Sequence, residues 1–155
     1  GVRFQQFEDE RNGPERLPDE LRGLPRPIVG YVGGIHQWVD QDLLAQAAQR
    51  LPNASFVLVG PAQTDVSVLA KHPNVHLLGA KSHDEVPRYI KGFDVGIVPY
   101  RLDEYTFHVY PTKLNEYLAM GIPTVATELP EVRRFNAEYG EIVAVARDPD
   151  QFAIE

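Results

Sequence analysis

Six short apolar runs, separated by segments with helical spacing, constrain the fold more than any other feature of the chain. Each run is four or five residues long and is apolar nearly throughout, instead of alternating apolar with polar residues. Strands of this kind are buried on both faces, which is typical of the parallel sheet of a doubly wound α/β domain. We therefore expect about six parallel strands, at 28–32, 55–59, 75–78, 95–98, 123–126 and 142–145.

The segments between these runs carry apolar residues on one helical face. Asp40 can cap the clearest of these helices, which places Leu43, Leu44, Ala47, Ala48 and Leu51 on one side. Further helices are expected over 64–71, 83–91, 111–120 and 130–135.

Residues 1–26 differ from the rest of the chain because they show no sustained apolar period. We expect a linker or edge segment there, in which 18–22 can form a short helix, followed by one α/β domain over 27–155. The chain does not begin with methionine, its only one being Met120, and a capped helix start at 148–155 stops after about two turns. We therefore expect the chain to be a piece of a longer protein.

Charge and composition exclude several classes of function. With 15 Lys and Arg against 22 Asp and Glu, the net charge of −7 argues against a nucleic-acid partner or direct binding to an anionic membrane. The chain has no cysteine, which excludes a disulfide framework and any thiolate metal site or nucleophile. No apolar run approaches the roughly 18 residues that span a bilayer.

Ligands of open α/β sheets bind outside the carboxyl ends of the strands. The segments that follow the expected strands on that edge are 33–38, 60–64, 79–83, 99–108 and 127–131. The functional residues are therefore expected in these segments.

The first expected strand ends in two adjacent glycines, Gly33 and Gly34. Residues 30–34 do not form the Gly-x-Gly-x-x-Gly fingerprint, and no acidic residue closes a second strand about 20 residues later, so NAD is not expected. The glycines either let the backbone approach a ligand closely or serve only as a tight turn. The run 79–82 imitates the end of a phosphate-binding loop but lacks the earlier glycine of that motif.

Two arrangements resemble metal ligands, but each has a simpler interpretation. Asp40 and Asp42 spell Asp-x-Asp, yet they stand where a helix cap and an acidic first turn belong. His72 and His76 are four residues apart, but a proline between them breaks any helix that would align them. We expect no metal site.

The most informative segment is the helix expected to begin at Pro111, a residue that suits the first turn of a helix. Thr112 and Lys113 then lie at a positively polarised helix end, which together with an ammonium can bind a phosphate. Glu116 lies one turn further on the same face, where its carboxylate can accept hydrogen bonds from a pair of sugar hydroxyls. The alternative is a surface ion pair between Lys113 and Glu116.

This segment resembles the donor-site signature of retaining GT-B glycosyltransferases of group 1 (family 4-like). The resemblance rests on residues 111–127, which read PTKLNEYLAMGIPTVAT, and on 129–132. Residues 1–4, 30–33 and 93–99 are similar to other parts of the family's pattern, so the resemblance extends over essentially the whole chain.

The resemblance implies two Rossmann-like domains with the active site between them. The C-terminal domain, which this chain resembles, binds the nucleotide-sugar donor without a metal or other cofactor. The missing N-terminal domain would bring a glycan or lipid-linked acceptor. By that resemblance Glu116 would hold the ribose hydroxyls and Lys113 would face the diphosphate. Gly33 and Gly34 would border the phosphates and sugar, while the backbone around Gly60 and around Lys81 and Ser82 would line the base.

The chain departs from the family's pattern in the residues that carry charge. Many members have Arg directly after the loop glycine and Lys a few residues later, where this chain has Gly34 and residues 37–39. The charge that faces the phosphates is therefore expected from Lys113, Arg101 and His36.

A second departure concerns the catalytic group. Many members place a second Glu eight positions before the ribose Glu, and this chain has His108 there. Glu104 or His108 is expected to take its place as the catalytic residue, and the choice stays open, as does retention or inversion at the sugar. Trp38 could stack on a sugar or fill the loop.

These features predict a cytoplasmic hexosyltransferase of polysaccharide biosynthesis, active as a longer protein and inactive as this piece alone. The missing half leaves room for peripheral association with the cytoplasmic face of a membrane. Two alternatives stay open, namely a nucleotide-sugar-binding module without transferase activity and a nucleotide-sugar epimerase of the same fold.

Overall fold

The computed structural model describes residues 17–102, 113–140 and 143–146. In these residues one six-stranded sheet forms, from β1 (Ile28–Val32), β2 (Ser55–Val59), β3 (Val75–Gly79), β4 (Val95–Val98), β5 (Thr124–Thr127) and β6 (Ala144–Ala146). The strand order is β3-β2-β1-β4-β5-β6, and every neighbouring pair is parallel. The chain therefore starts in the middle, winds to one edge and crosses back to the other, which confirms the predicted doubly wound sheet.

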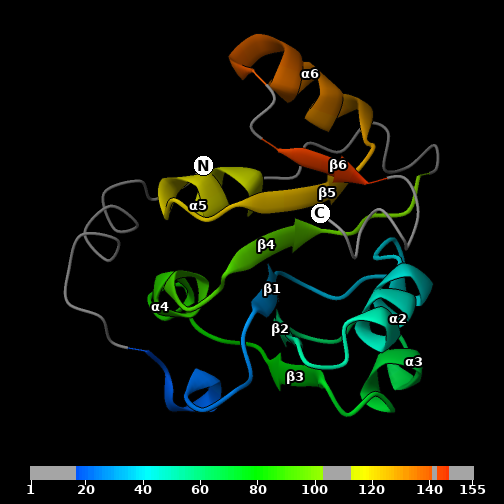
Figure 1. Cartoon of the computed structure of the whole chain (residues 1–155), viewed down its shortest axis with the longest axis vertical. Helices are drawn as coiled ribbons and strands as arrows, with labels where there is room; N and C mark the ends of the chain where they lie inside the picture. The colour runs from blue at the N-terminus through cyan, green and yellow to red at the C-terminus, as the bar shows by residue number, and fades with distance from the viewer. Residues whose placement is uncertain (1–16, 103–112, 141–142, 147–155) are drawn as a thin grey trace.

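Helices cover both faces of this sheet, as the apolar strands require. Figure 1 shows α2 and α3 on one side of the sheet and α4 and α5 on the other. A short 3-10 turn, η1, precedes β1. The helical elements are η1 (Asp19–Leu21), α2 (Gln41–Arg50), α3 (Ser67–Ala70), α4 (Val86–Lys91), α5 (Lys113–Ala119) and α6 (Pro130–Tyr139).

The strands are not buried equally. Every residue of β1 and β2 is buried, whereas Val75 to Leu78 of β3 are only partly buried. β3 has a neighbour on one side only, because it forms the edge of the sheet. The expectation of burial on both faces is therefore correct for the central strands and wrong for this edge strand.

Helix α2 begins as the sequence predicts. The carboxylate of Asp40 accepts a hydrogen bond from the backbone N–H of Leu43 at 3.1 Å, which is the capping contact expected at a helix start. The expected apolar face is buried, apart from Leu51 beyond the last turn, which is partly buried.

Helix α6 is longer than the predicted segment 130–135. The buried side chain of Asn136 donates to the carbonyl of Val143 at 2.9 Å and accepts from its N–H at 3.0 Å. Asn136 is polar and interrupts the apolar period from which the helix was predicted. Its two hydrogen bonds to Val143, seven residues further along the chain, satisfy this buried side chain, so the helix continues past it.

The described part of the expected linker packs against the domain. Leu21 of η1 is buried, and Leu17 and Leu21 lie so close to Gly92 that a Cβ there would come within 2.6 Å and 2.7 Å of their methyl carbons. Gly92 directly follows α4, so the segment before β1 is packed onto the end of that helix.

Candidate functional site

A cavity of about 250 Å³ opens where β1 and β2 end. Val32 and Val59, the last residues of these strands, belong to its wall. The wall also brings together residues that are far apart in the sequence and were predicted to bind the donor, namely Gly33, Gly34, Gly60, Lys81, Lys113 and Glu116. Their proximity is an observation, and their role in binding a donor stays a prediction.

Two glycine loops cross at the floor of this cavity. The N–H of Gly33 donates to the carbonyl of Val59 at 2.9 Å, which ties the loop after β1 to the end of β2. Gly60 has a φ of +152°, and a Cβ on it would lie 1.9 Å from the carbonyl oxygen of Gly33. Only glycine allows this close approach. The glycines therefore do more than end a strand, because they form the crossing that borders the cavity.

The ammonium of Lys113 lies against this crossing, between two buried tyrosine rings. A Cβ on Gly33 would come within 3.1 Å of Lys113 Cε. Lys113 Nζ lies 5.3 Å from the ring centroid of Tyr31 and 4.8 Å from that of Tyr100, and it donates a hydrogen bond to the Tyr100 hydroxyl. Aromatic faces attract a cation without neutralising it, so the charge of Lys113 is held in place and remains available to an anion.

Tyr31 also secures the glycine loop. Its hydroxyl donates to the carbonyl of Gly34 at 2.8 Å. Burial raises the pKa of Tyr31 above its ordinary value of 10, so the hydroxyl stays protonated and can keep donating. One side chain therefore supports both the loop and the lysine of the cavity.

Glu116 lies three residues after Lys113 on α5 and is partly buried in the cavity wall. Burial raises the pKa of Glu116 above its ordinary value of 4.5, while the charges of Lys113 and His83 oppose that rise. A partly desolvated carboxylate of this kind gains from hydrogen-bond donors such as sugar hydroxyls.

Tyr117 fixes α5 on the sheet and so positions both of these residues. Its buried hydroxyl donates to the carbonyl of Ile97 at 3.0 Å and accepts from the N–H of Val32 at 3.2 Å. The ring packs on Gly96, where a Cβ would come within 2.6 Å of it. The helix therefore cannot shift along the sheet without losing these bonds.

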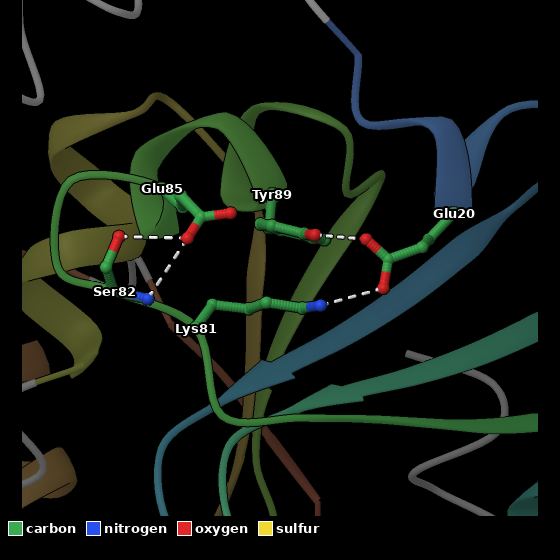
Figure 2. A network of polar contacts seen from close by, with 5 residues as sticks. All are labelled: Glu20, Lys81, Ser82, Glu85 and Tyr89. Atoms are coloured by element: carbon green, nitrogen blue, oxygen red, sulfur yellow. Dashed lines mark hydrogen bonds and ion pairs between the residues drawn. The ribbon is translucent and has the colours of Figure 1, made fainter.

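Lys81 borders the cavity from the loop after β3, and Figure 2 shows its side chain reaching toward η1. Its ammonium donates to Oε2 of Glu20 at 2.9 Å, and the hydroxyl of Tyr89 donates to Oε1 of the same carboxylate. These two bonds lower the pKa of Glu20 below its ordinary value of 4.5, so the carboxylate stays ionised near neutral pH.

Ser82, predicted to line the base, is engaged elsewhere. Its hydroxyl and its N–H both donate to Oε1 of Glu85, at 3.0 Å and 3.4 Å (Figure 2). The exposed Ser82 and Glu85 therefore close the turn that leads into α4, and Ser82 is not part of the cavity wall.

His36 and Arg101, the other predicted sources of positive charge, do not belong to the cavity wall. The ring of His36 stacks on Trp38 at a centroid distance of 3.9 Å, and a Cβ on Gly34 would come within 2.7 Å of His36 Nε2. Arg101 is exposed, and its N–H donates to the carbonyl of Trp38 at 2.7 Å. Their role toward a phosphate stays a prediction, as does stacking of Trp38 on a sugar.

Three predicted residues, Glu104, His108 and Thr112, lie outside the described residues. Over 17–102, 113–140 and 143–146, no group of three or more His, Cys, Asp and Glu side chains is arranged to hold a metal ion. No helix within the same ranges is long and apolar enough to cross a membrane.

The structure adds residues that the sequence analysis did not single out. His83 and Val86 belong to the cavity wall, and His83 ends the segment 79–83 that was predicted to face the ligand. Tyr31 carried no signal beyond its apolar character, and Tyr100 none beyond its place in the segment 99–108, because their contacts with Lys113 join separate parts of the chain. Glu20 carried none either.

Comparison with known proteins identifies the family of this chain. A family profile described as "Glycosyl transferases group 1" matches residues 26–155. A Bacillus subtilis (strain 168) protein is 36% identical over 143 residues, which cover 90% of this chain, and its name gives it a proposed role as the teichuronic acid biosynthesis glycosyltransferase TuaH. The chain spans 36% of the length of that relative.

Two solved structures share the fold at low sequence identity. Anabaena Alr3699/HepE, crystallised with UDP and glucose, is 18% identical with a TM-score of 0.63, over 99% of this chain and 43% of that one. A proposed UDP-N-acetylglucosamine 2-epimerase from Listeria monocytogenes is 10% identical with a TM-score of 0.63, over 96% of this chain and 41% of that one. These structures support the Rossmann-like architecture, and the profile and the Bacillus relative decide the family. The chain belongs to the group 1 glycosyl transferases.

Proposed function

We propose that this chain binds the UDP-sugar donor of a glycosyltransferase that transfers a hexose-type sugar to a glycan or lipid-linked acceptor. The observation that carries the proposal is the cavity whose wall brings Lys113 and Glu116 of α5 together with the glycines of the loops after β1 and β2. The presence of UDP and glucose in the Anabaena structure supports UDP as the nucleotide. The name of the Bacillus relative supports a polysaccharide as the product.

Each part of the donor has a chemical counterpart in the cavity. The diphosphate lies by the backbone of Gly33 and Gly34, with the ammonium of Lys113 against its charge, and Glu116 accepts the hydrogen bonds of the ribose hydroxyls. The base lies toward Gly60 and the loop that carries Lys81.

Catalysis in this scheme depends on stabilising the leaving diphosphate. An ammonium already held in place by two tyrosines needs little reorganisation when charge develops on the leaving group, which is the basis of electrostatic preorganisation. No metal is required in the proposal. Glu104 or His108 acts at the sugar, and retention of configuration belongs to the same proposal.

The activity of the whole protein is also a proposal, because this chain spans little more than a third of its Bacillus relative. A second domain supplies the acceptor site at the cytoplasmic face of the membrane. The 155-residue chain alone then binds UDP but transfers sugar slowly, because transfer needs both substrates held together and the cleft closed.

Thermal unfolding of the chain with UDP, GDP or NAD tests the proposal. A ligand at 100 times its dissociation constant stabilises a protein by about 2.7 kcal/mol, so UDP raises the midpoint clearly. Glu116→Ala abolishes the UDP shift, whereas the control Glu138→Ala, at an exposed position of α6, keeps it. A response to NAD alone, or an unchanged UDP shift in Glu116→Ala, contradicts the proposal.

An epimerase is the second candidate, because the Listeria structure shares the fold. The two are separated by incubating the full-length protein with UDP-N-acetylglucosamine in the absence of an acceptor. Formation of the 2-epimer favours the epimerase. Binding with neither epimer nor transfer in the presence of glycan acceptors favours a binding module.

A further inference from the structure

The cavity wall contains a second lysine, Lys81, whose charge is already engaged. Lys81 borders the cavity, yet its ammonium is bonded to the carboxylate of Glu20 at 2.9 Å. The Lys81 side chain is 20% exposed and the Glu20 side chain is 40% exposed, so water reaches this ion pair. The carboxylate of Glu20 is therefore paired with an ammonium that an anionic ligand of the cavity could bind.

Glu20 is itself held in this position. Tyr89 of α4 donates its hydroxyl to the carboxylate oxygen that Lys81 leaves free, so both oxygens are bonded within the protein. Figure 2 shows the Lys81 side chain passing beside Tyr89 on its way to Glu20, and its Nζ lies 5.7 Å from the centre of that ring. The carboxylate is therefore a built partner of Lys81.

This contact joins two distant parts of the chain. Glu20 belongs to η1, in the segment before β1 that Leu17 and Leu21 anchor against Gly92. Lys81 belongs to the loop after β3. The ion pair therefore links the position of η1 to the charge of the cavity wall.

We propose that Glu20 is an internal competitor for the anionic ligand of the cavity. A nucleoside diphosphate binds in full only when the ammonium of Lys81 leaves Glu20 and turns toward the phosphates. This inference rests on the proposed function, since it takes a nucleoside diphosphate as the ligand. Donor binding then removes one of the two bonds that hold Glu20, and with it η1, in place.

Two physical arguments support this exchange. A lysine carries its charge on a flexible four-carbon stem, so the ammonium can reorient while the stem stays in the wall. A solvent-exposed ion pair is weak enough to be broken by a ligand, and a diphosphate carries more negative charge than one carboxylate. The same carboxylate repels the diphosphate as long as Lys81 is turned toward it.

Calorimetric titration of the chain with UDP and with uridine tests the competition. Glu20→Gln tightens UDP binding by about threefold or more and leaves uridine, which has no phosphate, unchanged. Asp19→Asn is the matched control, because it removes the same charge from the same turn. The carboxylate of Asp19 pairs with Arg22 at 3.0 Å and not with Lys81. The UDP affinity of this variant stays within about twofold of the wild type because exposed charges are screened by salt.

Lys81→Met gives a second, independent measurement, because it keeps the stem and removes the ammonium. UDP binding weakens by about threefold or more, uridine binding is unchanged, and Glu20→Gln no longer tightens UDP in this background. Heat-induced unfolding of each variant confirms that it folds. If Glu20→Gln does not fold, the single variant Lys81→Met decides the question.

The outcomes separate this inference from the function on which it rests. If UDP binds the wild type and Glu20→Gln binds it no tighter, the competition is refuted while the proposed function stands. The same holds if Glu20→Gln still tightens UDP binding in the Lys81→Met background. Unchanged UDP affinity in Lys81→Met refutes the competition as well. If UDP does not bind the wild type at all, the proposed function fails and the inference fails with it.

Hydrogen exchange supplies a readout that a purely structural ion pair would not move. The amides of Leu21 and Arg22 are bonded to Pro18 and Asp19 within η1, at 3.0 Å and 3.1 Å. Saturating UDP speeds their exchange in the wild type and has no such effect in Lys81→Met. Equal exchange with and without UDP in the wild type contradicts the loosening of η1.

Discussion

The two lysines of the cavity wall are held in opposite ways. Lys113 lies between the rings of Tyr31 and Tyr100, and Lys81 is bonded to the carboxylate of Glu20. Aromatic rings and a neutral hydroxyl hold a cation without cancelling its charge, whereas a carboxylate cancels it. Two lysines in one cavity are therefore not equivalent. Lys113 presents a charge ready for a ligand, and the charge of Lys81 must first be released.

The surroundings of the two lysines differ in how tightly they are packed. On the Lys113 side, α5 is fixed by the buried hydroxyl of Tyr117 and the glycine loops cross in backbone contact. On the Lys81 side, a partly exposed edge strand leads into a loop that an exposed ion pair ties to η1. The cavity wall thus combines a tightly packed side with a side that an exposed ion pair holds.

The largest expected effect breaks the tightly packed side. Gly60→Ala places a Cβ 1.9 Å from the carbonyl oxygen of Gly33, so the loops must separate. We expect the free energy of unfolding to fall by about 3 kcal/mol or more, measured by urea denaturation. The control is Gly79→Ala before the Lys81 loop, where φ is +78° and no atom lies within 4 Å of the new Cβ. Backbone strain alone is expected to lower the free energy of unfolding of Gly79→Ala by about 1 kcal/mol. Equal losses in the two variants would contradict a close contact between Gly60 and Gly33.

The next effect compares the two lysines directly. Lys113→Met removes the available charge, and we expect it to weaken UDP binding by about 2 kcal/mol, which is about 30-fold. Lys81→Met is expected to weaken UDP binding by only about three- to tenfold, because the loss of the ion pair with Glu20 offsets part of the attraction between Lys81 and the phosphates. Calorimetric titration at one salt concentration measures both. A larger loss in Lys81→Met would reverse the comparison.

A smaller effect sharpens the role of the tyrosines. Tyr100→Phe keeps the ring over Lys113 but removes the hydroxyl that accepts its hydrogen bond. We expect UDP affinity to fall by about 1 kcal/mol, or about fivefold, with uridine affinity unchanged. The same titration measures it, and a thermal melt checks the fold. No change for UDP would show that the ring alone holds the ammonium.

The smallest effect is a pH dependence at Glu116. Its folded pKa is raised above 4.5 by burial, so the folded state holds the proton more tightly than the unfolded state. The stabilisation from protonated Glu116 is therefore complete below the ordinary pKa and is lost as pH rises through the raised one. The difference in unfolding free energy between wild type and Glu116→Gln is expected to fall over that window and to level off above it. A difference that grows with pH would contradict the burial argument.

Much of the fold could be predicted from local patterns. The strands were recognised because a buried parallel strand must be apolar on both faces, and α2 because Asp40 precedes an apolar face of helical spacing. The end of α6 was placed too early, since the helix continues through a contact of Asn136 with Val143, a residue that follows the helix and precedes β6. The exposure of β3 was not predicted, because the residues of a strand do not show whether it lies at the edge of the sheet.

The candidate site was predictable to a similar degree. The glycine loops, Lys113 and Glu116 follow strands or begin a helix at one edge of the sheet, and chain order alone brings them to that edge. The bonds of the Ser82 hydroxyl and N–H to Glu85 could not be predicted from the sequence, and the role of Ser82 toward the base stays a prediction. Which atoms a polar side chain faces depends on its neighbours in space.

By itself, the sequence determined the layers of the domain and the edge of the sheet at which the candidate residues gather, because these follow from local periodicity and the direction of the strands. Only the tertiary structure decided that Lys113 lies between tyrosine rings and that Lys81 is bonded to Glu20, 61 residues away in the chain. The electrostatic state of a lysine depends on the groups packed within a few ångströms of it, and packing of the whole chain decides which groups those are.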